Sequence, residues 1–336
     1  MSDPSVTPEP ILQVCAGLWA AGALKNGVDL KLFDALAAGP QDVAALSHTL
    51  GAAPQALRIV LDALVALGFV ARQAHGYTLT AVSSAFLVSS QPTYLGALVA
   101  DNAMSAAVFD VCRDYRRVVT EGYRLDPWAY SAGANERVVH LTRGLFTLGY
   151  PAAQAIADHL GWTPGTPAAL RLLEVGCGSA VYGLVALTRL PAARLTAQDW
   201  PVVLPVAQEF AAQLVVAERL QTLSGDFRTV EFGGPYDAVF LGHILHNYPE
   251  ETCHEILRKC LRVLAPGGCV IIIEFLAEPG TPESTFSWLF SVMIHGTRGG
   301  RSFSSAEMRQ MLTECGASRT EVGGELPVGF VVGYRS

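Results

Sequence analysis

Two histidines in the C-terminal half are the clearest candidates for chemistry in this 336-residue chain. His243 and His246 stand three residues apart in LGHILHNYPEE, after an apolar run at 238–241 and before a helix start at Pro249. A neutral imidazole titrates near about pH 6.5, so it can take a proton from a hydroxyl within hydrogen-bond reach. The following helix start favours the neutral ring. The alternative is an ordinary strand-to-helix junction.

Three short loops, two of which follow expected strands, have the residues to hold a nucleoside. LLEVGCGSAVYG closes a strand and opens a helix, and Gly176 and Gly178 allow close backbone approach to a ligand. The next strand ends at Asp199, where an acid can accept both hydroxyls of a ribose. In SGDF, Asp226 offers a carboxylate to an adenine amino group, and Phe227 offers a ring beside the base. Each acid alone could be a helix N-cap, but together the three loops favour ligand binding.

The elements that must position these loops form an α/β pattern from Arg171 onward. Buried strands are expected at 172–175, 194–197, 238–241 and 269–275. Helical stretches separate them, so right-handed crossovers predict a doubly wound parallel sheet. The segments 318–322 and 328–334 flank a GGELP turn and predict an antiparallel hairpin at the edge of that sheet.

The N-terminal part predicts a winged-helix arrangement. Helices are expected at 11–24, 28–37, 42–50 and 54–67, followed by two short strands at 69–72 and 77–80. Such modules often bind DNA, but the helix at 54–67 has one arginine and almost no polar face, so we expect it to be buried. The apolar helix at 11–24 needs a partner surface. A homodimerisation module is therefore predicted.

Composition excludes several other classes of protein. The chain is 51% hydrophobic and 16% charged, which is compatible with a large core. A formal net charge of −7 without a basic patch disfavours nucleic-acid and anionic-membrane partners. Seven scattered cysteines, with no C-x-x-C pair, argue against a disulfide framework and a zinc site. No apolar signal segment or membrane-length apolar run is present, so a cytoplasmic location is expected.

The ordered motifs resemble the class I S-adenosylmethionine-dependent methyltransferases. More narrowly, the chain is similar to the small-molecule O-methyltransferases of the caffeate, acetylserotonin and antibiotic-tailoring type. The resemblance covers nearly the whole chain, with QDWP where the family usually has FDLP and ILHNYPEE where it often has VLHDWxDE. It implies a Rossmann-like methyltransferase sheet with an antiparallel edge hairpin, preceded by a helical winged-helix dimerisation domain. The implied parts are a dimerisation domain at 1–95, a helical connector roofing the substrate pocket at 96–165 and a cofactor domain at 166–336.

The resemblance also implies a site, residue by residue. The positions expected to bind S-adenosylmethionine are Glu174, Gly176, Gly178, Asp199, Trp200, Gly225, Asp226, Phe227 and His243. His246 matches the general base. Because the sulfonium already activates the methyl group, the protein must align the acceptor and remove its proton, and no metal is expected.

A helical segment and one helix are expected to enclose the substrate. The segment 91–165 is rich in aromatic residues: Tyr94, Phe109, Tyr115, Tyr123, Trp128, Tyr130, Phe146 and Tyr150. The helix at 286–295 would form one wall, with Trp288, Met293 and His295 as candidate pocket residues beside Phe290. Plain core packing is the alternative for most of these side chains.

Three positions depart from the family pattern. Asn247 stands where the family often has Asp, Ser302 where many members have a Glu that orients the histidine, and Gly149 where others place a cofactor-binding Ser. Without these carboxylates, His246 is expected to be less firmly oriented and less basic. The predicted function is O-methylation of a small aromatic or polyketide-type metabolite. C- or N-methylation, or a non-methylating relative that keeps S-adenosylmethionine as a structural or electrostatic element, stays open. A metabolite-sensing winged-helix regulator is disfavoured by the intact loops.

Overall fold

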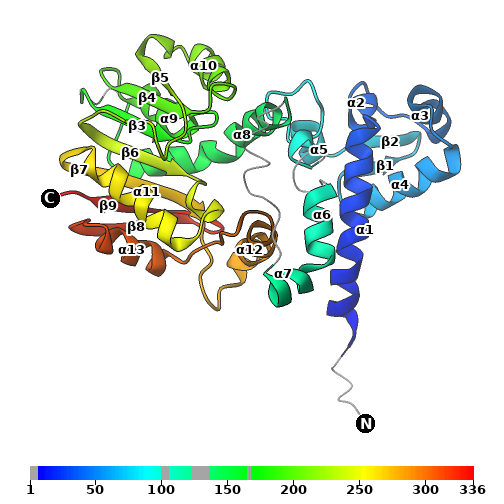
Figure 1. The fold of residues 1–336 in the computed structure, drawn as a ribbon. Helices are drawn as coiled ribbons and strands as arrows, with labels where there is room; N and C mark the ends of the chain where they lie inside the picture. Colours follow the sequence, from blue (N-terminus) through cyan, green and yellow to red (C-terminus); the bar gives the residue numbers. More distant parts are fainter. Residues whose placement is uncertain (1–6, 100–105, 123–135, 165, 167) are drawn as a thin grey trace. The chain divides into compact units, whose positions relative to one another are not determined.

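A computed structural model describes residues 7–99, 106–122, 136–164, 166 and 168–336. The chain forms two compact units, Met1–Ala106 and Ala107–Ser336 (Figure 1). Of the aromatic residues expected to roof the pocket, Tyr123, Trp128 and Tyr130 lie outside the described residues. The three-part division of the chain at 95 and 165 stays a prediction.

The first unit has the helix, turn, helix and wing order that the sequence predicted. Its elements are α1 (Glu9–Asp29), α2 (Leu32–Leu36), α3 (Val43–Leu50), α4 (Pro54–Ala66), β1 (Val70–Gln73), β2 (Gly76–Leu79) and α5 (Ala81–Phe86). The two strands pair antiparallel. The carboxylate of Asp42 caps α3 by accepting a hydrogen bond from the Ala45 amide at 2.8 Å. Leu32, Phe33 and Leu61 are central to its apolar core.

Two expectations for this unit were wrong. The helix expected at 28–37 is split, because α1 continues to Asp29 and Lys31, with a left-handed φ of 55°, precedes the short α2. Helix α4 was expected to be buried nearly all round. It buries only one face, formed by Leu57, Leu61 and Leu64, and leaves Ile59 65% exposed. The neighbouring helices cover one side of α4 only, so an apolar sequence did not by itself imply full burial.

Helix α1 has large apolar side chains that the single chain leaves exposed. They are Ile11, Leu12, Val14, Leu18 and Trp19. A contiguous apolar surface of this kind is uncommon on a monomer and marks an interaction surface. Among the described residues, no single helix is long and apolar enough to cross a membrane. Only the bent pair α3–α4, taken together, has the length and apolar composition of a membrane span.

The second unit contains the predicted sheet. Three helices come first: α6 (Ala106–Arg113), α7 (Tyr115–Glu121) and α8 (Glu136–His159). The strands are β3 (Arg171–Val175), β4 (Arg194–Asp199), β5 (Leu220–Ser224), β6 (Tyr236–Gly242), β7 (Leu264–Phe275), β8 (Arg319–Glu325) and β9 (Val328–Tyr334). Their order is β5-β4-β3-β6-β7-β9-β8, with β3 to β7 parallel and β9 antiparallel to both β7 and β8. The doubly wound sheet and its edge hairpin are therefore confirmed.

Strand β5 was not predicted from the sequence. Its residues, LQTLS, lack a long apolar run because the strand lies at the sheet edge and most of its side chains stay partly exposed. It nevertheless places the SGDF loop beside the loop that follows β4. Three strand ends thus lie in a row at the carboxyl edge of the sheet.

Helices cover both faces of the sheet (Figure 1). They are α8, α9 (Val181–Arg189), α10 (Leu204–Gln213), α11 (Glu250–Arg262) and α13 (Ser305–Glu314). Helix α12 (Thr285–Arg298) instead contacts the short 3-10 turns η3 (Leu245–Asn247) and η4 (Pro282–Ser284). One core cluster joins α8, α9 and α10 to the face that includes Phe240, and the other joins α11 and α13 to the face that includes Val239. Alternate residues of β6 therefore enter opposite layers.

Candidate active site

The loop after β3 has the backbone shape of a ligand-binding turn. Gly176 and Gly178 adopt left-handed φ values of 59° and 53°, and Ala180 follows at 56°. A Cβ on Gly176 would also lie 2.4 Å from the Cδ1 atom of Ile244, a side-chain end that could shift, so the left-handed backbone is the main reason that glycine is favoured here. The loop opens directly into α9, whose first amides point toward it.

Asp199, at the end of β4, holds this loop in place. One carboxylate oxygen accepts a hydrogen bond from the Gly178 amide at 2.8 Å, and the other accepts from the Trp200 amide at 2.7 Å. Burial raises the pKa of this carboxyl to about 6, against the opposing effect of the two amides. Each oxygen keeps a second acceptor position. Asp199 therefore fits the binding of two ribose hydroxyls. The hydrogen bonds that it accepts from the two amides also connect the first two loops.

Gln198 connects the first and third loops and was missed from the sequence. Its side-chain oxygen accepts from the Gly176 amide at 3.2 Å, and its side-chain nitrogen donates to the Gly225 carbonyl at 2.6 Å. The side chain is almost fully buried. An amide next to the buried Ala197 in this strand was the available signal, because a buried amide must find hydrogen-bond partners.

Glu174 lies beneath the first loop. Its carboxylate is buried and accepts a hydrogen bond from the Gly183 amide of α9 at 2.7 Å. Burial raises its pKa to about 8. The structure thus gives Glu174 a supporting contact to α9, and its predicted contact with the cofactor stays a prediction.

In the third loop, the side chains of Asp226 and Phe227 lie in different environments. Asp226 forms an ion pair with Arg228, whose Nε lies 3.0 and 2.9 Å from the two carboxylate oxygens. That hydrogen bond lowers the pKa of Asp226. Phe227 was expected to offer its ring beside the adenine base. Its ring is buried and lies edge-on to Tyr248 at 5.7 Å between centroids, and its contact with the base stays a prediction.

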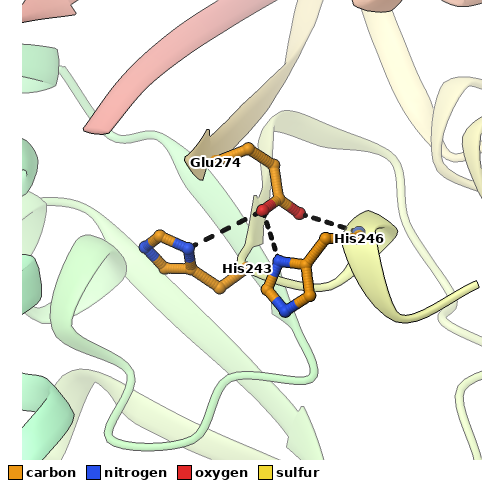
Figure 2. Close-up of side chains that lie close together, drawn as sticks. All are labelled: His243, His246 and Glu274. Carbon is orange, nitrogen blue, oxygen red and sulfur yellow. Dashed lines mark hydrogen bonds and ion pairs between the residues drawn. The ribbon is translucent and has the colours of Figure 1, made fainter. Parts of the chain in front are cut away.

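The two histidines of the opening motif meet a buried glutamate (Figure 2). His246 lies in η3 after β6, and its Nδ1 is 2.5 Å from Oε2 of Glu274, near the end of β7. The backbone amide of His246 also donates to Oε1 of Glu274 at 3.2 Å. Burial alone would raise the pKa of Glu274, but the charge of His246 and contacts with both imidazoles outweigh it and lower that pKa to about 2. Glu274 is therefore an ionised acceptor.

This pair corrects the expectation that His246 lacks a carboxylate partner. An ionised carboxylate can only accept, so Nδ1 of His246 carries the hydrogen and Nε2 has the free lone pair. The same arrangement orients and strengthens the base in serine hydrolases. The signal in the sequence was the single acid of VIIIEF, because a charged residue in a buried strand needs a partner.

His243 is the second imidazole at Glu274. Its Nδ1 lies 3.7 Å from Oε2, which is an ion-pair distance but too long for a hydrogen bond, and this buried nitrogen has no hydrogen-bond partner among the described residues. The backbone of His243 has a left-handed φ of 56°, and its amide donates a hydrogen bond to the Ile273 carbonyl at 2.8 Å, which fixes its position. The structure thus brings both histidines of the motif to one carboxylate, with His246 closer.

These three side chains are also the group in which a metal could be held. Among the described residues, His243, His246 and Glu274 place one donor atom each within 4.8 Å of one another. No such cluster was visible in the sequence, because 28 residues separate His246 from Glu274.

Aromatic rings surround the histidine pair. Phe290 of α12 meets His246 edge-on at 4.9 Å between centroids, and Phe275 lies 4.6 Å from His243. Phe275 also contacts Phe286 and Phe290, each at 5.0 Å. Because Phe286 is half exposed, this cluster presents an aromatic surface next to His246.

The candidate pocket residues on α12 differ in environment. Trp288 is 47% exposed, and Met293 is half-buried. His295 places Nδ1 3.2 Å from the Gly300 carbonyl, so it is tied to the loop after α12. Their contact with a substrate stays a prediction.

The three departures from the family pattern have distinct surroundings. The Asn247 side chain donates to the His243 and Ile244 carbonyls at 3.2 and 3.1 Å. Ser302 is buried, and its hydroxyl has no hydrogen-bond partner in the part of the chain that the structure describes. A Cβ on Gly149 would lie 2.6 Å from Val181, so α8 and α9 are in close contact there.

Comparison with known proteins identifies the family. The model of the O-methyltransferase domain matches residues 168–318, and that of the O-methyltransferase dimerisation domain matches 12–89. A 3-hydroxy-5-methyl-1-naphthoate 3-O-methyltransferase of Streptomyces sahachiroi is 30% identical, over 93% of this chain and 90% of the relative. Mouse acetylserotonin O-methyltransferase is 27% identical, over 92% of this chain and 83% of the mouse protein.

Solved structures agree with this assignment. A crystal structure from Nostoc punctiforme assigned to the O-methyltransferases is 26% identical, with a TM-score of 0.83 over 99% of this chain and 100% of that one. Human N-acetylserotonin methyltransferase with bound S-adenosylmethionine, at 19% identity, shares the fold with a TM-score of 0.83 over the whole of both chains. This chain therefore belongs to the S-adenosylmethionine-dependent O-methyltransferases.

Proposed function

We propose that this enzyme methylates a phenolic hydroxyl of a fused-ring aromatic metabolite, with His246 as the general base. The observation that carries the proposal is the 2.5 Å pairing of His246 Nδ1 with buried, ionised Glu274. That pairing leaves Nε2 as the proton acceptor. A phenol titrates near about 10, so its proton must be removed as the new bond forms at neutral pH.

The chain's residues divide the remaining work. When bound, S-adenosylmethionine supplies an electrophilic methyl group. Asp199 would hold the ribose hydroxyls, and the backbone at Gly176, Gly178 and Gly225 would admit the rest of the molecule closely. Trp200 and His243 complete the proposed contacts. His246 would receive the acceptor's proton, and Glu274 would stabilise the resulting imidazolium.

The acceptor class is inferred from the rings beside the base. Phe275, Phe286 and Phe290 offer faces and edges to a flat substrate, and aromatic pairs favour such offset or edge-on contacts. The Streptomyces sahachiroi relative acts, by its name, on a hydroxyl of a naphthoate. Hydroxynaphthoates are therefore the first acceptors to test.

The test is a product assay with defined acceptors. Mono-hydroxynaphthoates are incubated with S-adenosylmethionine, and the product is examined by mass spectrometry and NMR. A methoxy product formed by the wild type, and lost in His246→Ala, supports the proposal. Methylation at carbon or nitrogen, or turnover unchanged in His246→Ala, refutes it.

We also propose that the chain works as a homodimer. The matched dimerisation domain and the exposed apolar side chains of α1, Trp19 foremost at 72% exposure, support this. Pairing of two copies through α1 would remove that surface from water.

A further inference from the structure

The loop after α12 presses its backbone against the turn that carries His246. An ideal Cβ on Gly300 would lie 2.0 Å from the carbonyl oxygen of His246 and 2.6 Å from the amide nitrogen of Tyr248. Real Cβ atoms essentially never come this close, and the atoms they would meet are backbone. Gly300 does not have a left-handed φ. Space, not conformation, therefore requires glycine here.

The same loop is bound to α12 at three points. The Gly299 amide donates to the His295 carbonyl at 3.0 Å, and Nδ1 of His295 donates to the Gly300 carbonyl at 3.2 Å. The Ser302 amide donates to Oγ of Ser291 at 3.0 Å. The loop and the C-terminal half of α12 consequently move together.

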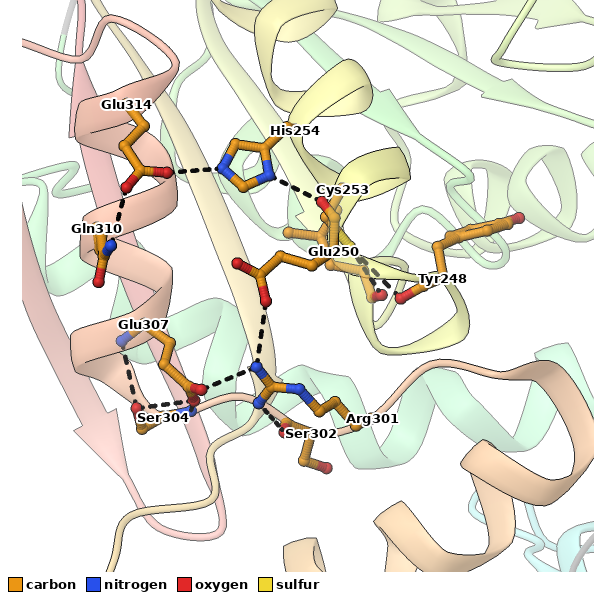
Figure 3. Close-up of polar contacts among 11 residues, drawn as sticks. Tyr248, Glu250, Cys253, His254, Arg301, Ser302, Ser304, Glu307, Gln310 and Glu314 are labelled. Atoms are coloured by element: carbon orange, nitrogen blue, oxygen red, sulfur yellow. Dashed lines mark hydrogen bonds and ion pairs between the residues drawn. The ribbon is translucent and has the colours of Figure 1, made fainter. Parts of the chain in front are cut away.

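Arg301 connects the loop to α11 and α13 through two ion pairs (Figure 3). Its Nη2 lies 2.8 Å from Oε1 of Glu307, in the first turn of α13, and 3.4 Å from Oε2 of Glu250, in the first turn of α11. Its guanidinium also stacks over the Phe303 ring at 4.2 Å. If the loop after α12 moved away from η3, these contacts of Arg301 would break.

We propose that Gly300 and Arg301 are positioning residues that keep His246 in line with Glu274 and couple the base to the aromatic wall on α12. This inference rests on the proposed role of His246. Both contacts with Glu274, from Nδ1 and from the backbone amide, depend on where the His246 backbone lies. A displacement of about 1 Å is enough to cost on the order of 100-fold in rate when reacting groups must be aligned. Because α12 also contains Phe286 and Phe290, an acceptor that shifts the wall would shift the base.

The test compares Gly300→Ala with Gly333→Ala. A Cβ on Gly333 would lie 2.7 Å from Cδ2 of Leu312, so this control crowds a flexible side chain in the same unit, away from His246. The direct readout is the low-field Nδ1–H resonance of His246 in full-length protein labelled with ¹⁵N-histidine. It is assigned by its loss in His246→Ala and its shift in Glu274→Gln. The second readout is turnover of a hydroxynaphthoate.

Gly300→Ala is expected to lose or shift the resonance and to lower kcat about 100-fold, with KM for S-adenosylmethionine unchanged. Gly333→Ala should keep both the resonance and kcat, even if it melts at a lower temperature. Arg301→Gln should shift the resonance less than Gly300→Ala and lower kcat about tenfold. If Gly300→Ala does not fold, Arg301→Gln tests the positioning role in its place. An unperturbed resonance with kcat within twofold of wild type, in whichever variant folds, overturns the inference.

The proposed base and the proposed positioning fail in different ways. If His246→Ala retains wild-type turnover, His246 is not the base, yet the resonance in Gly300→Ala still decides whether the loop positions the ring. If His246→Ala is inactive and Gly300→Ala matches wild type in both readouts, the base stands and the positioning role is refuted.

Discussion

The Nδ1 atom of His246 and the Oε2 atom of Glu274 lie 2.5 Å apart in the core, although 28 residues separate them in the chain. Both groups are buried, and the Glu274 pKa is lowered to about 2. The carboxylate therefore stays ionised throughout the range in which imidazole titrates. This relationship fixes the tautomer of His246 and leaves its Nε2 atom free to accept a proton in the proposed mechanism.

Replacing Glu274 with Gln is expected to lower kcat about 10²- to 10⁴-fold. The amide can donate to Nδ1 and so favour the tautomer whose Nε2 already has a hydrogen. Calorimetry should show unchanged affinity for S-adenosylmethionine. Glu278→Gln is the matched control, because Glu278 accepts from the Ser305 amide and is not part of the pair. Equal turnover in the two variants would show that Glu274 does not act on the base.

His246→Ala is expected to lower turnover about 10²- to 10⁴-fold at neutral pH while cofactor affinity stays the same. The loss should shrink as the pH rises toward the pKa of the acceptor hydroxyl, because the acceptor then ionises without help. The measurement is kcat against pH for the variant and the wild type. A loss under about tenfold that is flat with pH would instead indicate catalysis by proximity alone.

The affinity for S-adenosylmethionine is expected to fall as the pH drops through about 6. Burial raises the pKa of Asp199 to about 6, so the carboxylate is ionised above that pH and becomes protonated below it. A protonated carboxyl has fewer acceptor positions for the ribose. Asp199→Asn should weaken binding by about 2–3 kcal/mol at pH 8 and remove the dependence between pH 5 and 7. Calorimetric titration at each pH checks this, and parallel curves for both proteins would contradict it.

The full-length protein is expected to be a dimer at micromolar concentration in light scattering. Trp19→Asp should shift it toward monomer, because a charge replaces a large apolar side chain on the exposed face of α1. Val215→Asp is the control, since Val215 is 89% exposed in the other unit and its left-handed φ suits Asp. A monomeric wild type would refute the dimer.

A chelator is expected to leave turnover unchanged, whereas added Zn²⁺ is expected to inhibit. Two imidazoles and a carboxylate with donors within 4.8 Å suit Zn²⁺, and binding there would occupy the His246–Glu274 pair. The measurement is the initial rate of methylation in the presence of EDTA and at increasing concentrations of Zn²⁺. Loss of turnover in EDTA that is restored by a metal would show instead that the chemistry depends on that metal.

The sequence by itself determined the parts of the site that depend on strand ends. Gly176 follows β3 and Asp199 ends β4, and parallel strands bring their carboxyl ends to one edge. Local patterns therefore sufficed to place the first two cofactor loops, whereas β5, which places the third, was not predicted. The winged-helix module and the edge hairpin were predictable for the same reason, since each is built from neighbouring segments joined by short turns.

Only the tertiary structure decided which side chains face one another across the sheet. The Phe227 ring packs against Tyr248, Gln198 bridges two loops, and Gly300 meets the His246 backbone, all through contacts between distant segments. No local pattern encodes such contacts.

Glu274 shows the physical reason most clearly. The pairing of β6 with β7 shifts between Tyr236 and Ala238, and beyond that irregularity Gly242 pairs with Ile273. Because successive side chains of a strand point to opposite faces, a shift of one residue would have turned Glu274 away from His246. That register depends on how both strands pack against their helices, so only the folded chain could bring this acid to the histidine.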